Sequence, residues 1–164
     1  MIRRPLRCSA IKRKSEPKKR KKSELSAFKK KLWPKFAKYI KDLKGNDCIS
    51  CDRKGLVGKD LHAGHMLSAG TYPGLKWEVP NVNPQCSYDN IFRKGNYLEY
   101  RERFIAKHGQ EEYDKLWNRR HDARQYRLED LQEIDRMIDK FYEEKASERA
   151  SKMTKTGADH DTQR

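Results

Sequence analysis

The sequence predicts an α+β fold in which two short strands and a helix form a small core around a metal site. Metal-ligating side chains are concentrated between Cys48 and Asn96, and the flanking segments carry apolar residues at helical spacing. Only 35% of the 164 residues are hydrophobic. The core is therefore expected to be small, and small cores commonly depend on a structural metal.

The chain is strongly basic. It has 39 Lys and Arg against 24 acidic residues, a net charge of +15, which favours binding to a polyanion such as nucleic acid. Residues 1–22 hold eleven of these basic residues and a single acid, Glu16. We expect this segment to be a disordered arm that either condenses onto phosphates or only keeps the chain in solution. No apolar run resembles a signal peptide or a membrane span, so an intracellular protein without membrane association is expected.

An amphipathic basic helix is expected over residues 23–45. Apolar residues recur in steps of three and four from Leu25 onward, and Ser23 can cap the first turn. Pro34 predicts a kink or a break near Trp33, because proline removes a helical hydrogen bond. The Lys-rich face of this helix either contacts phosphate or is simply solvated.

Three of the four cysteines indicate a zinc site. Cys48 and Cys51 have the spacing of a zinc knuckle, and Cys86 follows a second strand-like run. Cys8 lies in the basic arm, and we expect it to be a free thiol. This distribution does not resemble a disulfide framework, which agrees with a reducing compartment.

Two strands are predicted, over residues 61–66 and 81–85. His62 and His65 both lie on the first strand. Because side chains alternate between the faces of a strand, they can share one site only if a bulge at Gly64 or the end of the strand turns one of them.

A helix is expected from Ser87, carrying Asn90, Arg93 and Lys94, until Gly95 breaks it. Further helices are expected over 97–109, 110–120 and 127–145. The predicted organisation is a disordered basic arm at 1–22, the basic helix at 23–45, a metal-stapled core at 46–109, C-terminal helices at 110–146 and a disordered polar tail at 147–164.

This order of elements suits phosphodiester hydrolysis. A histidine can take a proton from water near neutral pH. Asparagine oxygens suit a magnesium ion that retains several waters, and helical Lys and Arg can grip neighbouring phosphates. A knuckle, a strand ending in histidine, a loop, a second strand and a helix with asparagine are typical of a ββα-metal nuclease core.

The sequence resembles the NinG (Rap) family of phage recombination proteins and, more broadly, the zinc-stapled HNH endonucleases. The resemblance covers roughly residues 40–145. Its motifs are C-x-x-C at 48–51, H-A-G-H at 62–65, N-V-N-P-Q-C at 81–86 and N-x-x-x-K-G-N at 90–96.

The resemblance implies a structure-selective endonuclease that acts on branched DNA, such as D-loops and Holliday junctions, in the cytoplasm of a bacterial host. It implies an HNH-like ββα-metal core. Phage recombination or replication proteins are possible partners, and a homodimer would make paired cuts on a four-way junction plausible.

The resemblance also implies roles for individual residues. His65 matches the general base, Asn81 matches the residue that orients the base or shapes its loop, and Asn90 matches the last ligand of a catalytic Mg²⁺ or Mn²⁺. Many HNH proteins have an acidic ligand where this chain has Gly64. His62 either replaces that ligand, contacts phosphate, or is structural.

The zinc ligands implied by the resemblance are Cys48, Cys51, Cys86 and Asp89, the last standing where the family pattern has a fourth cysteine. Three thiolates with a carboxylate are less common than other zinc sites. His62 or Cys8 could supply the fourth ligand instead, or the zinc could have been lost.

Two other functions are compatible with the sequence: a non-catalytic zinc-stapled protein that binds branched DNA, and a recombination adaptor. Zinc ribbons that only bind DNA need no pairing of His65 with Asn90, so this pair favours catalysis. In every case we expect contacts to the DNA backbone from four basic residues: Arg93, Lys94, Arg101 and Arg103.

Overall fold

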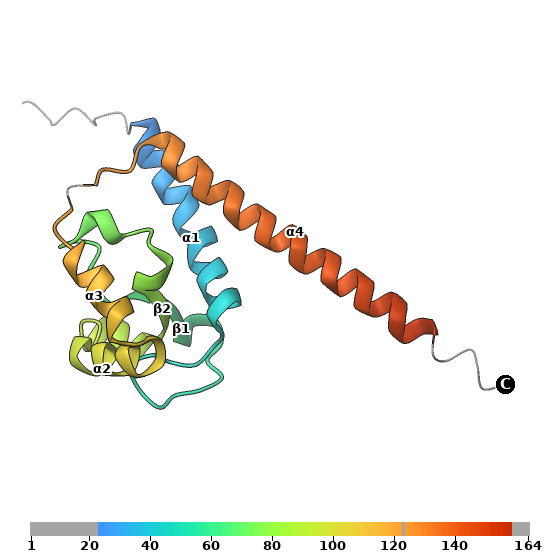
Figure 1. Ribbon diagram of the computed structural model, residues 1–164, viewed down its shortest axis with the longest axis horizontal. Helices are drawn as coiled ribbons and strands as arrows, with labels where there is room; N and C mark the ends of the chain where they lie inside the picture. The colour runs from blue at the N-terminus through green and yellow to red at the C-terminus, as the bar shows by residue number, and fades with distance from the viewer. Residues whose placement is uncertain (1–22, 123, 159–164) are drawn as a thin grey trace, which may run out of the picture.

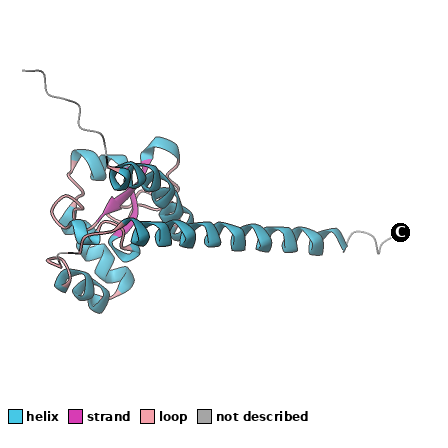
Figure 2. Cartoon of the chain, turned by 90° about the horizontal axis from the view of Figure 1, so that it is seen from above, coloured by secondary structure: helices cyan, strands magenta, loops and turns pink. Residues whose placement is uncertain are grey.

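The computed structural model describes residues 23–122 and 124–158, with side chains as far as residue 152. The predicted basic arm at 1–22, with Cys8, lies outside the described residues. The helices are α1 (Glu24–Lys44), α2 (Tyr97–His108), α3 (Gln110–Asn118) and α4 (Leu128–Ala158), and the strands are β1 (Leu61–His65) and β2 (Val82–Cys86). The fold is α+β, and the sheet lies between α1 on one side and α2 and α3 on the other (Figures 1 and 2).

The sheet is a two-stranded antiparallel ladder. Leu61 lies opposite Cys86 and His65 lies opposite Val82, without a bulge between them. The bounds of both strands agree within one residue with the prediction. The ladder thus places Cys86, at the end of β2, and both histidines of β1 on one rigid unit.

Helix α1 has the predicted start but not the predicted interruption. The side chain of Ser23 caps it by accepting a hydrogen bond from the backbone N of Ser26. The helix continues through Pro34, so the expected break near Trp33 is wrong. Pro34 is exposed, whereas the residues that flank it include the fully buried Phe36. Packing of the buried face holds both halves of the helix in one element despite the proline.

Helix α4 runs beside α1 in the same direction. Lys35 of α1 pairs with Asp135 and Asp139, and one turn later Lys38 donates to the hydroxyl of Tyr142. Leu131 and Ile138 of α4 are fully buried in one cluster with residues of α1, so the apolar stripe predicted for α4 is packing surface, as expected.

Helix α4 continues well past the predicted end of its stripe and projects beyond the body of the molecule (Figure 1). The disordered tail expected from residue 147 is therefore wrong as far as Ala158. Half of residues 147–158 are Ala, Glu, Lys or Arg, which favour helix without an apolar face, and a helix propagates easily from a packed segment. Among the described helices, none is long and apolar enough to cross a membrane.

Two hydrophobic clusters flank the sheet. One contains Phe36 of α1, Ile138 of α4 and Val82 of β2. The other contains Tyr100 and Phe104 of α2 with the residues that follow β1. The hairpin is thus packed on both faces, which fixes the direction of its side chains.

The helix predicted from Ser87 is a single π-helical turn, Tyr88–Phe92. The chain then turns through Lys94, Gly95 and Asn96, whose φ angles are 50°, 91° and 47°. The helical segment thus ends at Phe92, before Arg93 and Lys94, and not at Gly95 as expected. The β-β-α order is present with a very short third element, and its identity as an HNH core remains a prediction.

Candidate functional site

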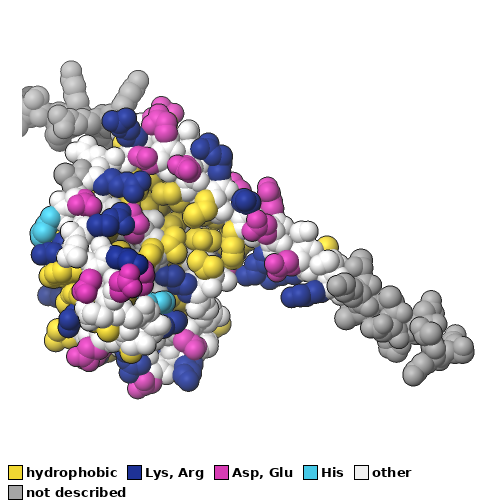
Figure 3. All heavy atoms as spheres, viewed as in Figure 1, with side chains coloured by type: hydrophobic (Ala, Val, Ile, Leu, Met, Phe, Trp, Pro, Cys, Tyr) yellow, Lys and Arg dark blue, Asp and Glu magenta, His cyan; other side chains and the backbone are white. Residues whose placement is uncertain are grey.

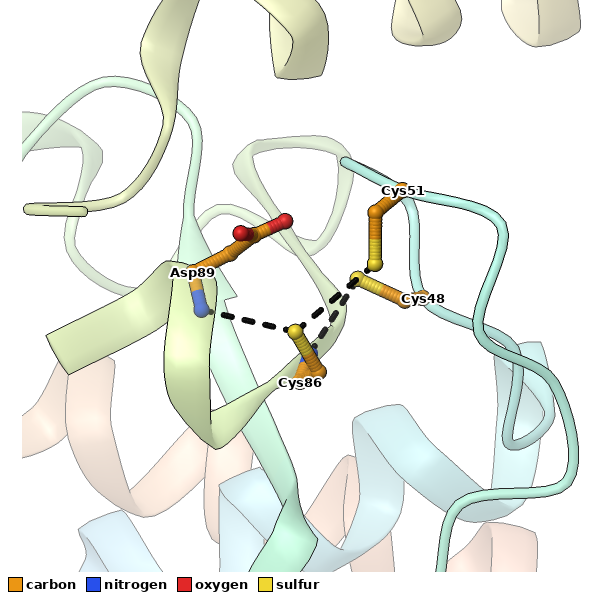
Figure 4. A group of neighbouring side chains, drawn as sticks. All are labelled: Cys48, Cys51, Cys86 and Asp89. Atoms are coloured by element: carbon orange, nitrogen blue, oxygen red, sulfur yellow. Dashed lines mark hydrogen bonds between the residues drawn. The ribbon is translucent and has the colours of Figure 1, made fainter. Parts of the chain in front are cut away.

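Three thiols and one carboxylate meet between the knuckle and the end of β2 (Figure 4). Cys48, Cys51, Cys86 and Asp89 place their ligand atoms within 4.8 Å of one another. The Sγ atoms of Cys51 and Cys86 are 3.7 Å apart. Tetrahedral zinc with Zn–S bonds of about 2.3 Å separates two sulfurs by about 3.8 Å. The cluster therefore fits a metal ion such as Zn²⁺.

Backbone amides hold this cluster in place. The N–H of Cys86 donates to Cys48 Sγ at 3.2 Å, and the N–H of Asp89 donates to Cys86 Sγ at 3.4 Å. The N–H of Ile49 donates to the carbonyl of Pro84 at 2.9 Å, which fixes the knuckle on β2. Hydrogen bonds to sulfur favour the thiolate form that binds metal.

Asp89 is the carboxylate of the cluster and is only 2% exposed. It accepts hydrogen bonds from Ser50 Oγ at 2.8 Å and Asn96 Nδ2 at 3.2 Å. Burial opposes its ionisation, but these bonds outweigh burial and hold the pKa of Asp89 below its ordinary value. An ionised, oriented carboxylate is suited to be the fourth ligand.

The three thiols can all be deprotonated at the same time only when a cation is bound among them. Burial, followed by the neighbouring Cys48 thiolate, raises the pKa of the Cys51 thiol to about 12. Cys51 is therefore protonated at neutral pH unless a metal is bound. Metal binding at this cluster should release protons, as it does at other thiolate sites.

Two substitutions test Asp89 as a ligand. Asp89→Cys supplies a fourth thiolate, and we expect it to tighten zinc binding at least about tenfold, because thiolate is the preferred ligand of structural zinc. Asp89→Asn keeps the shape but removes the charge, and should weaken binding about 10–100-fold. Competition with a chromogenic chelator measures both. Wild-type affinity in both variants would show that Asp89 does not hold the metal.

His62 and Asn90 form a second polar site, between the start of β1 and the π-helical turn that follows β2. The Nε2–H of His62 donates to the carbonyl of Lys59 at 3.1 Å. This leaves Nδ1 as the basic nitrogen, and Nδ1 lies 2.9 Å from Asn90 Nδ2. Both side chains are half-buried, so solvent and a substrate can reach them.

The spacing of this pair suits a small divalent cation. A half-turn of the Asn90 carboxamide exchanges its nitrogen and oxygen, which places Oδ1 beside His62 Nδ1. Adjacent ligands of an octahedral Mg²⁺, at about 2.1 Å from the ion, lie about 3.0 Å apart. The residues present therefore fit two neighbouring ligands of Mg²⁺ or Mn²⁺.

His65 faces the opposite side of β1. Its Nε2–H donates to the carbonyl of Lys76 at 2.9 Å, and its ring stacks on Trp33 of α1 with centroids 5.1 Å apart. The neutral ring therefore carries its basic lone pair on Nδ1. Burial lowers the pKa of His65 below the ordinary value, and the Lys76 ammonium adds to this. His65 is thus a neutral, oriented imidazole.

The two histidines do not converge on one face. A bulge at Gly64 was one of the two conditions for a shared site, and the ladder through Gly64 is regular. The other condition remains open, because His65 is the last residue of β1. The structure brings His62 together with Asn90 and leaves His65 on the other face of the strand.

Asn81 is fully buried and joins two loops. Its Oδ1 accepts from the N–H of Leu67 at 2.8 Å, and its Nδ2 donates to the carbonyls of Leu67 and Leu75 at 2.9 and 3.0 Å. Leu75 precedes Lys76, whose carbonyl orients His65. These are the contacts of a residue that shapes the loop, and its effect on catalysis remains a prediction.

Three of the four basic residues expected to bind DNA are engaged within the chain. Arg93 Nη2 lies 3.3 Å from Glu99 Oε1, and Arg103 Nη2 lies 2.8 Å from Asp52 Oδ1. The guanidinium of Arg101 lies over the ring of Tyr113. Basic and acidic side chains are interspersed over the face seen in Figure 3. Exposed ion pairs of this kind are weak and can exchange their acid for a phosphate.

Sequence reasoning missed a buried polar network behind the hairpin. Gln85 is fully buried, and its Nε2 donates to Ser50 Oγ at 2.8 Å and to the carbonyl of Gly95 at 2.7 Å. Ser50 in turn donates to Asp89, so the network connects β2 with the metal cluster. Polar residues alternating in a short strand (Asn83 and Gln85) were the signal for it.

Lys44 of α1 takes part in a second set of hydrogen bonds to β2. Its Nζ donates to the carbonyls of Val79 and Val82 at 2.6 and 2.8 Å, and to Asn83 Oδ1 at 2.9 Å. Asn83 Nδ2 donates to the hydroxyl of Tyr100 at 3.0 Å. The Lys-rich helix thus uses its last lysine to fix β2 rather than to meet solvent.

The family model for the bacteriophage lambda NinG protein matches residues 3–151 of the chain. The chain is 30% identical over 87 residues to the NinG proteins of Escherichia phage lambda and Escherichia phage 933W, which is 53% of this chain and 41% and 42% of those proteins. The NinG protein of Enterobacteria phage H19B is 29% identical over 87 residues. The chain thus aligns with about two fifths of the length of these curated relatives. No solved structure matches it. Because the family model covers most of the sequence, the chain belongs to the NinG family.

Proposed function

We propose that this chain is a metal-dependent endonuclease that cleaves branched DNA intermediates of recombination, such as D-loops and Holliday junctions. The observation that supports it best is the contact between His62 Nδ1 and the Asn90 carboxamide, 2.9 Å apart at the end of a metal-stapled hairpin. A structural zinc module that only binds DNA has no need of such a pair.

The residues have separate tasks in this proposal. Zinc on the cysteine cluster keeps β2 and the π-turn in register. His62 and Asn90 hold the catalytic Mg²⁺ or Mn²⁺, which when bound stabilises charge on the scissile phosphate and the leaving oxygen. His65 Nδ1 takes the proton from the attacking water, because the bond from Nε2 to Lys76 holds that tautomer.

The substrate follows from charge and from family. A net charge of +15 attracts DNA. The proposal also includes a preference for branched DNA and a role in recombination. It further includes partners among phage recombination or replication proteins and a homodimer that cuts both strands. They derive from the likeness to the NinG family.

The test compares cleavage and binding of four-way, D-loop and linear DNA with Mg²⁺ or Mn²⁺. We expect His65→Ala to bind branched DNA normally and to cut it at least about 100-fold more slowly, as for loss of a general base. Asn90→Ala should also lose cutting, and higher Mn²⁺ should partly restore it, because the defect is in cation binding. His108→Ala is the control, since this histidine packs on Phe104 at the end of α2.

The position of His65 and His62 on opposite faces of β1 favours one competing function, a non-catalytic zinc-stapled protein that binds branched DNA. If the wild type binds junctions but does not cut under any metal, and His65→Ala binds equally, the nuclease proposal is wrong and this function replaces it.

Cleavage should continue to a lower pH than is usual for an enzyme with a histidine base. Burial lowers the pKa of His65, so its base form persists below the ordinary histidine value of about 6.5. The cleavage rate should therefore stay constant as the pH falls to the ordinary histidine pKa. It should drop only when the pH passes through the lowered pKa of His65, where Nδ1 becomes protonated. A pH–rate profile measures this, and a midpoint above about 6.5 would contradict His65 as the base.

A further inference from the structure

An open cavity of about 300 Å³ lies between the end of β1, the turn after the π-helix and α3. Its walls include Tyr72, Tyr97, Trp117, Lys94 and His65. Its volume is at the lower end of the range for small-ligand sites. It is too small for a helix of a partner protein and large enough for one flat ring.

Three aromatic side chains line the cavity, and contacts with Tyr113 hold two of them in place. The hydroxyl of Tyr97 hydrogen-bonds that of Tyr113 at 3.0 Å, and Trp117 stacks on Tyr113 with centroids 5.9 Å apart. Tyr97 remains 37% exposed, and Tyr72 and Trp117 are half-buried. The cavity therefore offers preformed aromatic surface to a ligand without first ordering these side chains.

Positive charge lies in the wall of the cavity and close to it. Lys94 is exposed in the wall of the cavity. The Arg120 guanidinium lies 4.0 Å over the ring of Trp117, and that of Arg101 lies 4.9 Å over Tyr113. Aromatic rings interleaved with cations are the composition of sites that bind single-stranded nucleic acid, where bases stack and the backbone meets Lys and Arg.

The cavity adjoins the proposed chemistry, because His65 is one of its walls. The segment Met66–Ser68, which directly follows this histidine, continues along the same cavity. A base held there would have its own phosphate within reach of the end of β1.

We propose that this cavity receives one unpaired nucleobase from a DNA branch point, stacked on its aromatic walls, while Lys94 contacts the adjoining phosphate. A base inside a duplex must first be unpaired and unstacked, whereas a base at a branch is already partly free. The cavity would therefore select branched over linear DNA and place the branch beside His65. This inference rests on the proposed function, since it names the feature of DNA that the same site recognises.

Photocrosslinking tests the inference without requiring cleavage. The full zinc-loaded chain is bound, with Ca²⁺ in place of Mg²⁺, to junctions that carry 5-iodouracil at an unpaired position beside the branch. A matched junction carries it inside a duplex arm. We expect the branch probe alone to crosslink, and peptide mapping to place the adduct on Tyr72, Tyr97 or Trp117.

A cavity-filling variant provides the second measurement. Thr71 is exposed and lines the cavity, so Thr71→Trp should fill it from the rim and lower the affinity for branched DNA about tenfold, with little change for linear DNA. Gln132→Trp, at an exposed position of α4, is the matched control. Melting temperatures confirm that both variants fold.

The outcomes separate this inference from the proposed function. If the wild type binds and cuts junctions, but crosslinks map outside the cavity and Thr71→Trp binds normally, the inference alone is overturned. The cavity would then hold something other than a base, such as a side chain of a partner protein. If the wild type binds no branched DNA at all, the proposed function fails and this inference with it.

Discussion

Cys86→Ser is expected to release the structural metal and to unfold the hairpin region of the chain. Cys86 is fully buried, ends β2 and lies 3.7 Å from Cys51 Sγ. It also receives the backbone N–H of Asp89. Binding of structural zinc contributes about 10–16 kcal/mol in small zinc modules, which is as large as the whole stability of a typical domain. Loss of one thiolate should therefore remove most of the cooperative unfolding transition.

Metal analysis and thermal unfolding measure this effect together. We expect bound zinc to fall from about one ion per wild-type chain to a small fraction, and a chelator to produce the same loss in the wild type. Cys8→Ser is the control, because the sequence predicts a free thiol there. A variant at Cys86 that keeps both zinc and the wild-type melting temperature would rule out the cluster as a structural metal site.

Local patterns were sufficient for most of the fold. The spacing of apolar residues placed α1, α2, α3 and the packed part of α4, and both strands were placed within one residue. Two of the errors concern the continuity of helices. The continuity of α1 through Pro34 depends on tertiary packing of its buried face, which no local pattern shows. The extension of α4 depends on helix-forming residues, which the sequence does show, and on helix propagating from a packed segment, which it does not.

The metal cluster was predictable in part. The C-x-x-C spacing and Cys86 indicated the three thiolates, whereas Asp89 was implied by the family resemblance, with His62 and Cys8 as alternatives. The structure places Asp89 with the three cysteines. The relation of His62 to His65 was not predictable in full. It depends on whether the ladder is regular at Gly64, and that depends on pairing with the neighbouring strand β2.

Gly64→Ala is expected to destabilise the fold by about 4 kcal/mol, the combined cost of overpacking and of broken buried hydrogen bonds. A Cβ at this position would lie 2.1 Å from Gln85 Oε1 and 3.0 Å from Gln85 Cβ. Gln85 cannot swing away at little cost, because it is fully buried and donates to Ser50 Oγ and to the carbonyl of Gly95. Moving it would leave these buried partners unsatisfied.

The same clash should reach the metal. Ser50 Oγ accepts from Gln85 and donates to Asp89, so displacement of Gln85 disturbs a bond that orients the carboxylate ligand. Gly64→Ala should therefore lower both the denaturant midpoint and zinc affinity.

Gly70→Ala is the matched control, since its Cβ would meet only Ser68 Oγ, at an ordinary 3.6 Å. Unchanged stability in Gly64→Ala would contradict the packing of Gln85 on this glycine. A loss of stability with unchanged zinc affinity would show that the network does not support Asp89. An aspartate at position 64 would meet the same obstruction, so this packing leaves no room for an acidic ligand directly before His65.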